Sequence, residues 1–107
     1  MWVVATAVAT VVSCQSSAPS RELFAQPVTY SIAGYAWSIA LGDLDQDGVA
    51  DLAVGYGGPP QGSVSVFRNH GDGTFAAPMD YLADGEPLSV AIGGLSASGA
   101  ADLVTAN

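Results

Sequence analysis

Four aspartates stand at positions 1, 3, 5 and 9 of one nine-residue segment, with a glycine at position 6. The carboxylates are Asp43, Asp45, Asp47 and Asp51, and the glycine is Gly48. A hard cation such as Ca²⁺ takes six to eight oxygen ligands at about 2.3–2.6 Å. Alternate residues of a tight loop can point inward together, so the spacing predicts that this segment wraps Ca²⁺ in oxygen.

The rest of the segment supports the same interpretation. Val49 is expected to supply its backbone carbonyl as a ligand, and Gly48 permits the positive φ that a sharp turn needs. The alternative is a solvated acidic turn, because Asp and Gly are common in turns. An EF-hand would need a glutamate at position 12, and that position is Val54. Four carboxylates so close together repel one another without a counter-ion, which favours the Ca²⁺ site.

The chain also repeats itself with a period of 51 residues. Residues 24–56 and 75–107 align without a gap and are identical at 13 of 33 positions. A period of this size is typical of stacked supersecondary units, and about 40–50 residues is the size of a propeller blade. We therefore expect one β-unit per period.

The segments within one period have the pattern of strands. Four runs alternate between apolar and small or polar residues, which is the periodicity of a half-buried strand: Ser38–Leu41, Asp51–Val54, Ser63–Phe67 and, more weakly because of Pro78, Thr74–Tyr81. Turn residues occupy the connections at 43–51, 55–62 and 69–73. The predicted fold class is all-β, built from four-stranded antiparallel blades.

Residues 38–54, 64–66 and 69–75 together resemble the FG-GAP/VCBS repeat, which forms the β-propeller of integrin α-subunits and of many bacterial surface proteins. The resemblance covers residues 24–107. It implies a partial β-propeller of about one and a half four-stranded antiparallel blades, with a first period at 24–74 and an incomplete second one at 75–107.

The resemblance also implies which residues bind the metal. The ligands would be the carboxylates of Asp43, Asp45, Asp47 and Asp51, together with the carbonyl of Val49. Gln46 stands where the family more often has glycine, and we expect this change to be harmless. The second copy has glycine and two serines at the first three ligand positions and keeps only the last carboxylate, Asp102. It is predicted to keep the turn and lose the metal.

The N-terminus has the features of an export signal. Residues 2–12 are uncharged and mostly apolar, which suits a secretory signal and is too short for a membrane-spanning helix. We predict a signal peptide at 1–13, Cys14 as a lipidation site and a tether at 14–23. The residue before the apolar run is neither Lys nor Arg. An N-terminal strand rich in Val and Thr is the alternative.

Other patterns argue against catalysis and against nucleic-acid binding. The net charge of −8, from ten acidic and two basic residues, should repel a phosphate backbone. His70 has no nucleophile beside it in sequence. A carboxylate pair for glycoside hydrolysis drawn from Asp80, Asp84 or Glu86 is less expected than solvated acids, so no enzyme is predicted.

Three aromatic residues without aromatic counterparts in the second copy, Tyr35, Trp37 and Tyr56, are candidates for ligand contact on loops, with local packing as the alternative. The predicted function is a calcium-stabilised extracellular binding or adhesion module, secreted or at the cell surface, and an outer-membrane lipoprotein if Cys14 is lipidated. Its partner would be a protein or carbohydrate ligand. An accessory region of a secreted hydrolase or lyase and a structural spacer are the alternatives.

Less than two periods are present, whereas propellers typically close with four to eight blades. A fragment of a longer protein is the simplest explanation, and a ring completed by several copies is the other. The isolated chain is expected to be a monomer with poorly protected ends.

Overall fold

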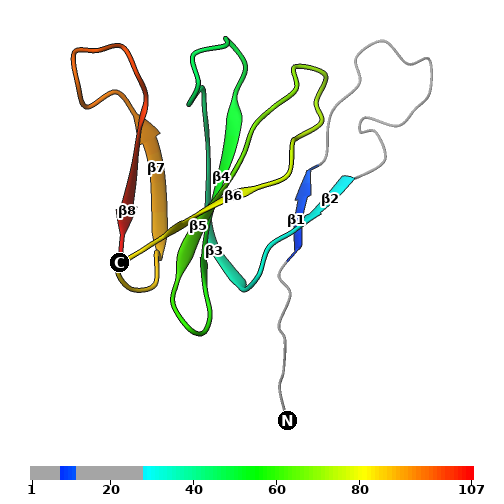
Figure 1. The fold of residues 1–107 in the computed structure, drawn as a ribbon, viewed down its shortest axis with the longest axis vertical. Helices are drawn as coiled ribbons and strands as arrows, with labels where there is room; N and C mark the ends of the chain where they lie inside the picture. Colours follow the sequence, from blue (N-terminus) through cyan, green and yellow to red (C-terminus); the bar gives the residue numbers. More distant parts are fainter. Residues whose placement is uncertain (1–7, 12–27) are drawn as a thin grey trace, which may run out of the picture.

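The computed structural model describes residues 8–11 and 28–107, and these residues form strands, turns and loops without a helix (Figure 1). The all-β prediction is therefore confirmed. Cys14, the tether at 14–23 and the remaining residues of the predicted signal peptide lie outside the described residues. Residues 8–11, inside that segment, form a strand. Within the described chain there is no helix long and apolar enough to cross a membrane.

The centre of the molecule is a complete four-stranded antiparallel sheet. Its strands follow one another in chain order: β3 (Tyr35–Gly42), β4 (Asp51–Gly57), β5 (Ser63–Phe67) and β6 (Met79–Leu82). β4 and β5 are buried along their whole lengths, because both faces of the sheet are covered there. Such a meander is the expected architecture of one propeller blade.

A pair of strands flanks each face of this sheet. β1 (Val8–Val11) pairs antiparallel with β2 (Val28–Ser31) on one side, and β7 (Ser89–Gly93) pairs with β8 (Asp102–Ala106) on the other (Figure 1). The sheets of four and two strands agree with the expectation of partial blades. β2 was not among the expected strands, and β1 lies in the apolar run for which an N-terminal strand was the alternative to a signal.

The 51-residue period relates the strands to one another. Shifted by 51 residues, β2 falls on β6, β4 begins where β8 begins, and β3 overlaps β7. β2 thus corresponds to the last strand of the central sheet, whereas β7 and β8 correspond to its first two strands. The described chain therefore contains one four-stranded sheet and, on either side of it, a strand pair that corresponds to part of such a sheet.

The core divides into two clusters, one on each face of β4 and β5. The first joins the central sheet to β2 and contains Ile32, Leu52, Val54, Tyr56 and Phe67, with Tyr30 and Phe75 packed against it. The second joins the sheet to β7 and β8 and contains Ala53, Val64, Val66 and Val90, with Ala40, Leu44, Ile92 and Leu103 packed against it. Alternation along β4 sends successive side chains to opposite clusters.

Two details differ from the sequence expectation. The fourth strand does not run over Thr74–Tyr81; β6 starts at Met79, directly after Pro78, because proline cannot donate to a ladder. Phe75 forms an isolated bridge with Asn69 instead. β4 continues to Gly57, so Tyr56 is a buried strand residue and not a loop residue free to contact a ligand. The ligand-contact hypothesis was wrong for Tyr56.

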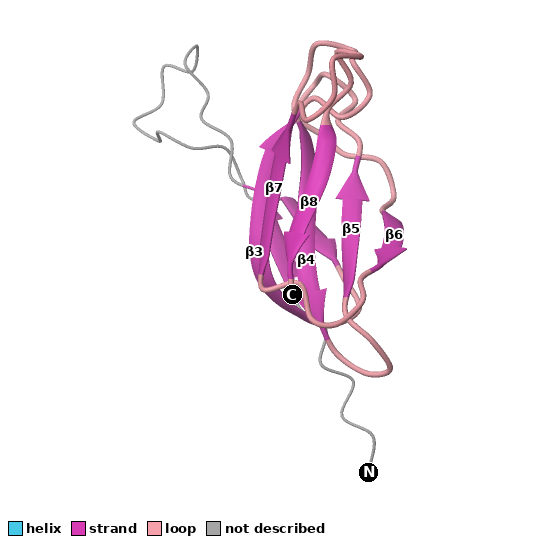
Figure 2. Cartoon of the chain, turned by 90° about the vertical axis from the view of Figure 1, so that its left-hand side faces the viewer, coloured by secondary structure: helices cyan, strands magenta, loops and turns pink. Residues whose placement is uncertain are grey.

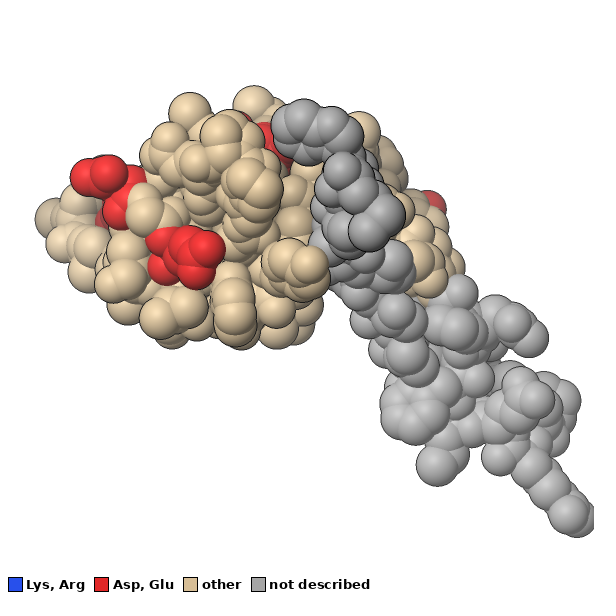
Figure 3. Space-filling view, turned by 90° about the horizontal axis from the view of Figure 1, so that it is seen from below, with Lys and Arg blue, Asp and Glu red and all other residues tan. Residues whose placement is uncertain are grey.

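Three loops gather at one end of the strands: the β3–β4, β5–β6 and β7–β8 connections (Figures 1 and 2). The opposite end, viewed along the strands, shows scattered acidic side chains, and no Lys or Arg is visible among its described residues (Figure 3). The aspartates predicted to bind metal belong to the β3–β4 connection, so they lie at the end where the three loops gather.

Candidate metal centre

The β3–β4 connection, which we call the aspartate loop (residues 43–51), is shaped by two positive φ angles. Gly48 adopts φ 86°, as expected for a turn glycine, and Gln46 adopts φ 62°. A residue with a Cβ is strained in this left-handed region. The backbone therefore explains why glycine suits the position of Gln46. Contrary to our expectation, glutamine at this position carries a conformational cost.

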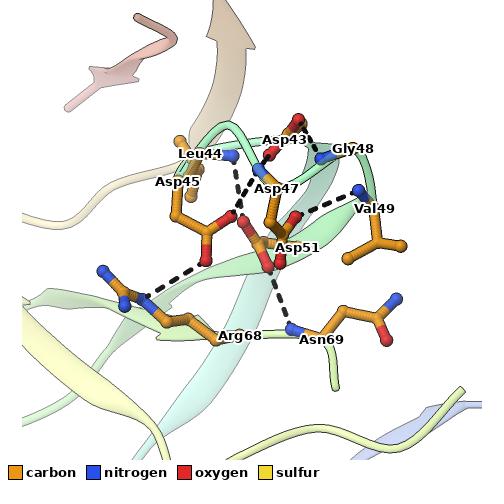
Figure 4. A network of polar contacts seen from close by, with 9 residues as sticks. All are labelled: Asp43, Leu44, Asp45, Asp47, Gly48, Val49, Asp51, Arg68 and Asn69. Carbon is orange, nitrogen blue, oxygen red and sulfur yellow. Dashed lines mark hydrogen bonds and ion pairs between the residues drawn. The ribbon is translucent and has the colours of Figure 1, made fainter. Parts of the chain in front are cut away.

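Asp43 closes the loop from its first position. Its carboxylate accepts hydrogen bonds from the backbone N–H groups of Asp47, at 3.1 Å, and Gly48, at 2.9 Å (Figure 4). These bonds, that from Gly48 above all, lower the pKa of Asp43, because a donated N–H stabilises the charged carboxylate. Asp43 is therefore held in the ionised form that a cation requires.

Asp51, the first residue of β4, has a fully buried side chain. Its two oxygens accept hydrogen bonds from backbone N–H groups on either side, those of Leu44 at 2.9 Å and of Asn69 at 2.9 Å. A buried carboxylate is costly unless it is paired or hydrogen-bonded, and these two bonds meet that need. Asp51 thus joins the aspartate loop to the start of the β5–β6 loop.

Asp45 has the opposite electrostatic environment. Desolvation raises its pKa, and the carboxyl of Asp47 and the negative charge of Asp51 raise it further. Arg68 Nε lies 4.0 Å from Asp45 Oδ2, but the Arg68 side chain is 62% exposed, so water and salt screen the pair. Without a bound cation, the charge of Asp45 is poorly compensated.

The oxygens of Asp43, Asp45 and Asp51 converge, with one oxygen from each lying within 4.8 Å of the others. Two oxygens on opposite sides of a Ca²⁺ ion are separated by at most about 4.6–5.2 Å. The three oxygens are therefore close enough together to share one such ion, and they are hard donors of the type that Ca²⁺ selects. The donor set fits a calcium ion.

Asp47 and Val49 stand apart from this group. Asp47 does not belong to the converging set, and its Oδ1 accepts a hydrogen bond from the Val49 N–H at 3.0 Å (Figure 4). Their assignment as ligands stays a prediction. Of the four predicted carboxylates, the structure brings three together.

The second copy of the loop, residues 94–102, repeats the hairpin with only the last of the four carboxylates, Asp102. Asp102 accepts a hydrogen bond from the Leu95 N–H at 2.8 Å, as Asp51 does from Leu44, and Gly99 has φ 80°. Ser96 and Ser98 hydrogen-bond to each other at 2.7 Å. The expected retention of the turn is confirmed, so the other aspartates of the first loop are not needed to form it.

Sequence reasoning missed two neighbours of the site, both from the start of the β5–β6 loop. Asn69 donates its backbone N–H to Asp51 and its side-chain amide to the Ala50 carbonyl, at 2.9 Å. Arg68 approaches Asp45. Both lie about 20 residues further along the chain, and their distance from the aspartates in sequence concealed the contact.

The candidates for catalysis show structural contacts. Asp80 accepts a hydrogen bond from the hydroxyl of Ser65 across the β5–β6 pair. His70 donates its backbone N–H to the Thr74 carbonyl at 2.9 Å within the turn. Neither contact has the form of a nucleophile beside a base.

Comparison with known proteins identifies the same part of the chain. Residues 35–67, which contain β3, the aspartate loop, β4 and β5, match the family model described as FG-GAP repeat. Human integrin alpha-7 is 43% identical over 65 residues, which cover 59% of this chain and 5% of that protein. No solved structure gives a significant match. These matches support the FG-GAP repeat.

Proposed function

We propose that the aspartate loop binds Ca²⁺, and that the ion holds the β3–β4 hairpin in shape within an extracellular, non-enzymatic binding or adhesion module of the β-propeller type. The observation that carries the proposal is the convergence of Asp43, Asp45 and Asp51, whose oxygens lie within 4.8 Å of one another. The FG-GAP match spans the same loop and supports it.

In this proposal the three converging carboxylates form the main part of the ligand set. Asp47 and the carbonyl of Val49 complete it after a small adjustment of the loop. Neighbouring carboxylates with no counter-ion repel one another, and a divalent ion removes this repulsion. The pKa of Asp45 is raised by desolvation first and then by its neighbours Asp47 and Asp51, and a cation beside these groups would offset the last two effects.

Ca²⁺ would act here as a structural ion. Asp51 connects the aspartate loop to Asn69, so order imposed on the loop extends to the start of the β5–β6 connection. Extracellular calcium modules bind with dissociation constants of about 10⁻⁴–10⁻³ M, which suits a site that is filled outside the cell.

The repeat type and the match to integrin alpha-7 support the proposed adhesion role. We propose a protein as the ligand, bound by a complete propeller of which this chain supplies a part. Secretion through the segment at 1–13, and attachment through a lipid on Cys14, remain predictions from the sequence.

The test is calorimetric titration of the metal-free protein with Ca²⁺. We expect one site per chain, with a dissociation constant of about 10⁻⁴–10⁻³ M, and weaker binding of Mg²⁺, which demands a tighter octahedral shell. The matched control is Asp84→Asn, which removes one charge from an exposed acid far from the loop in sequence and should bind as the wild type does. Absence of heat and of any melting shift would refute the proposal.

A further inference from the structure

Arg68 is the basic side chain that lies beside the aspartate loop. Its Nε lies 4.0 Å from Asp45 Oδ2 (Figure 4). The sequence contains one other Lys or Arg, which is Arg21 and lies outside the described part of the chain. The candidate calcium site therefore already has one positive charge next to it, and the protein itself supplies that charge.

The backbone at Arg68 is held in this position from both sides. Arg68 directly follows β5, and its carbonyl accepts a hydrogen bond from the Ala76 N–H at 2.8 Å. The next residue, Asn69, donates its backbone N–H to Asp51 and its side-chain amide to the Ala50 carbonyl, both at 2.9 Å. The base of the Arg68 side chain is thus fixed beside the aspartate loop by the contacts that join the two loops.

The guanidinium end of the side chain is less constrained. The Arg68 side chain is 62% exposed, and it borders a groove of about 410 Å³ together with Val66 and Tyr81. The guanidinium can therefore leave Asp45 for water while the backbone contacts at its base stay intact.

Among the three converging carboxylates, Asp45 has the weakest hydrogen bonding. Asp43 and Asp51 each accept two backbone N–H bonds, at 2.9–3.1 Å. Asp45 accepts one such bond, from Asp47, and its length of 3.3 Å exceeds those of the other four. Arg68 thus approaches the carboxylate whose charge the backbone compensates least.

We propose that Arg68 is the counter-ion of the empty calcium site, and that Ca²⁺ displaces its guanidinium from Asp45 on binding. This inference rests on the proposed calcium site. An ion bound to Asp45 Oδ2 at about 2.3–2.6 Å would lie at most about 6.6 Å from Arg68 Nε in its present position. Two cations so close together repel each other. The arginine therefore stabilises the empty loop and lowers its affinity for the ion.

The size of the effect follows from the exposure of the pair. Water and salt screen ion pairs between exposed side chains, and their usual strength corresponds to a factor of about 1.4–5 in a binding constant. At an ionic strength of about 0.05 M the Debye length is about 14 Å, which exceeds the distance between Arg68 and the ion. The effect should therefore be measured at this ionic strength.

Calorimetric titration with Ca²⁺ compares the wild type with Arg68→Gln and Arg68→Lys. Glutamine removes the charge, so the dissociation constant should fall by a factor of about 1.4–5. Lysine keeps the charge, so Arg68→Lys should bind Ca²⁺ as the wild type does. An unchanged or higher dissociation constant in Arg68→Gln overturns the inference, and the calcium site then still stands. An equal gain in both variants also overturns it, because the charge is then not what opposes the ion.

Failure of the proposed function has a different signature. If none of the three proteins gives heat or a melting shift with Ca²⁺, the calcium site itself is refuted, and this inference with it. The matched control is Arg21→Gln, which changes the net charge of −8 by the same one unit and should bind as the wild type does. A gain in affinity equal to that of Arg68→Gln would show that the net charge of the chain sets the affinity, and would contradict the inference.

The melting temperature separates this role from a merely structural one. In chelator, Arg68→Gln should melt below the wild type by up to about 8 °C, because Asp45 loses its counter-ion. In the Asp45→Asn background, where that carboxylate is absent, the same substitution should have little effect. The calcium-induced rise in melting temperature should be larger in Arg68→Gln than in the wild type. An equal loss of melting temperature with and without Ca²⁺ would show that Arg68 only supports the loop, and would overturn the inference.

Discussion

Replacement of Asp45 by asparagine should separate the metal role of the aspartate loop from its structural role. Asparagine has nearly the shape of aspartate but carries no charge. Asp45 accepts only one backbone hydrogen bond, from Asp47 at 3.3 Å, and its ion pair with Arg68 is screened. In a chelator the variant should melt at the same temperature as the wild type or higher, because it no longer places a desolvated charge beside Asp47 and Asp51.

In Ca²⁺ the order should reverse. With a dissociation constant of about 10⁻⁴–10⁻³ M, 10 mM Ca²⁺ stabilises the wild type by about 1.4–2.7 kcal/mol. For a domain of this size, that corresponds to a rise in melting temperature of roughly 6–20 °C. One of three converging carboxylates is lost in the variant, and binding should weaken on the order of tenfold or more. The calcium-induced rise then falls to at most about half of the wild-type value.

The assay is differential scanning fluorimetry of both proteins, with chelator and with 10 mM Ca²⁺, and Asp84→Asn as the charge-matched control. Equal calcium-induced rises in the wild type and in Asp45→Asn would refute the reasoning. So would a large loss of stability in chelator, because it would show that Asp45 holds the loop together without any ion.

Three further predictions concern the same loop. Gln46→Gly should raise the free energy of unfolding by up to about 1 kcal/mol, because glycine adopts the left-handed backbone without strain, although it adds chain entropy to the unfolded state. A lower free energy of unfolding in urea denaturation would contradict the strain at Gln46. Asp51→Asn and Asp102→Asn should each destabilise the protein in chelator. The loss should be larger for Asp51→Asn, because Asp51 is buried and accepts two backbone N–H bonds, whereas Asp102 accepts one from Leu95. Equal melting temperatures of Asp51→Asn and the wild type would rule out a structural role for Asp51. The calcium-induced rise in melting temperature should shrink as the pH falls from 7 towards 4. The reason is that the pKa of Asp45 lies above its ordinary value of 3.8, so that a proton competes with the ion for this carboxylate. A rise in melting temperature that is the same at both pH values would exclude Asp45 as a ligand.

The sequence was sufficient wherever the signal was local. The alternation of residues 38–41, 51–54 and 63–67 located β3, β4 and β5, because strand periodicity is visible over a few residues. The spacing of the aspartates likewise located a loop whose carboxylates converge. The same local rule placed the turn of residues 94–102, where glycine and the final aspartate are retained.

Features that depend on distant contacts could not be found in this way. β1 lies in an apolar run that suits a signal peptide equally well, and only its pairing with β2 distinguishes the strand. Tyr56 follows a glycine that suggests a turn, yet the first core cluster surrounds it. The bond between Asn69 and Asp51 spans 18 residues of chain, and no local pattern indicates it.

The two hairpin loops show that closing the turn does not depend on the first three aspartates of the aspartate loop. Asp51 and Asp102 close their loops in the same way, by accepting the N–H of the second loop residue, whereas the carboxylates before them differ completely. Changes at those earlier positions can therefore add or remove carboxylates without disturbing the turn. Arrays built from this unit are free to vary the acidity of their loops from one blade to the next while the architecture stays constant.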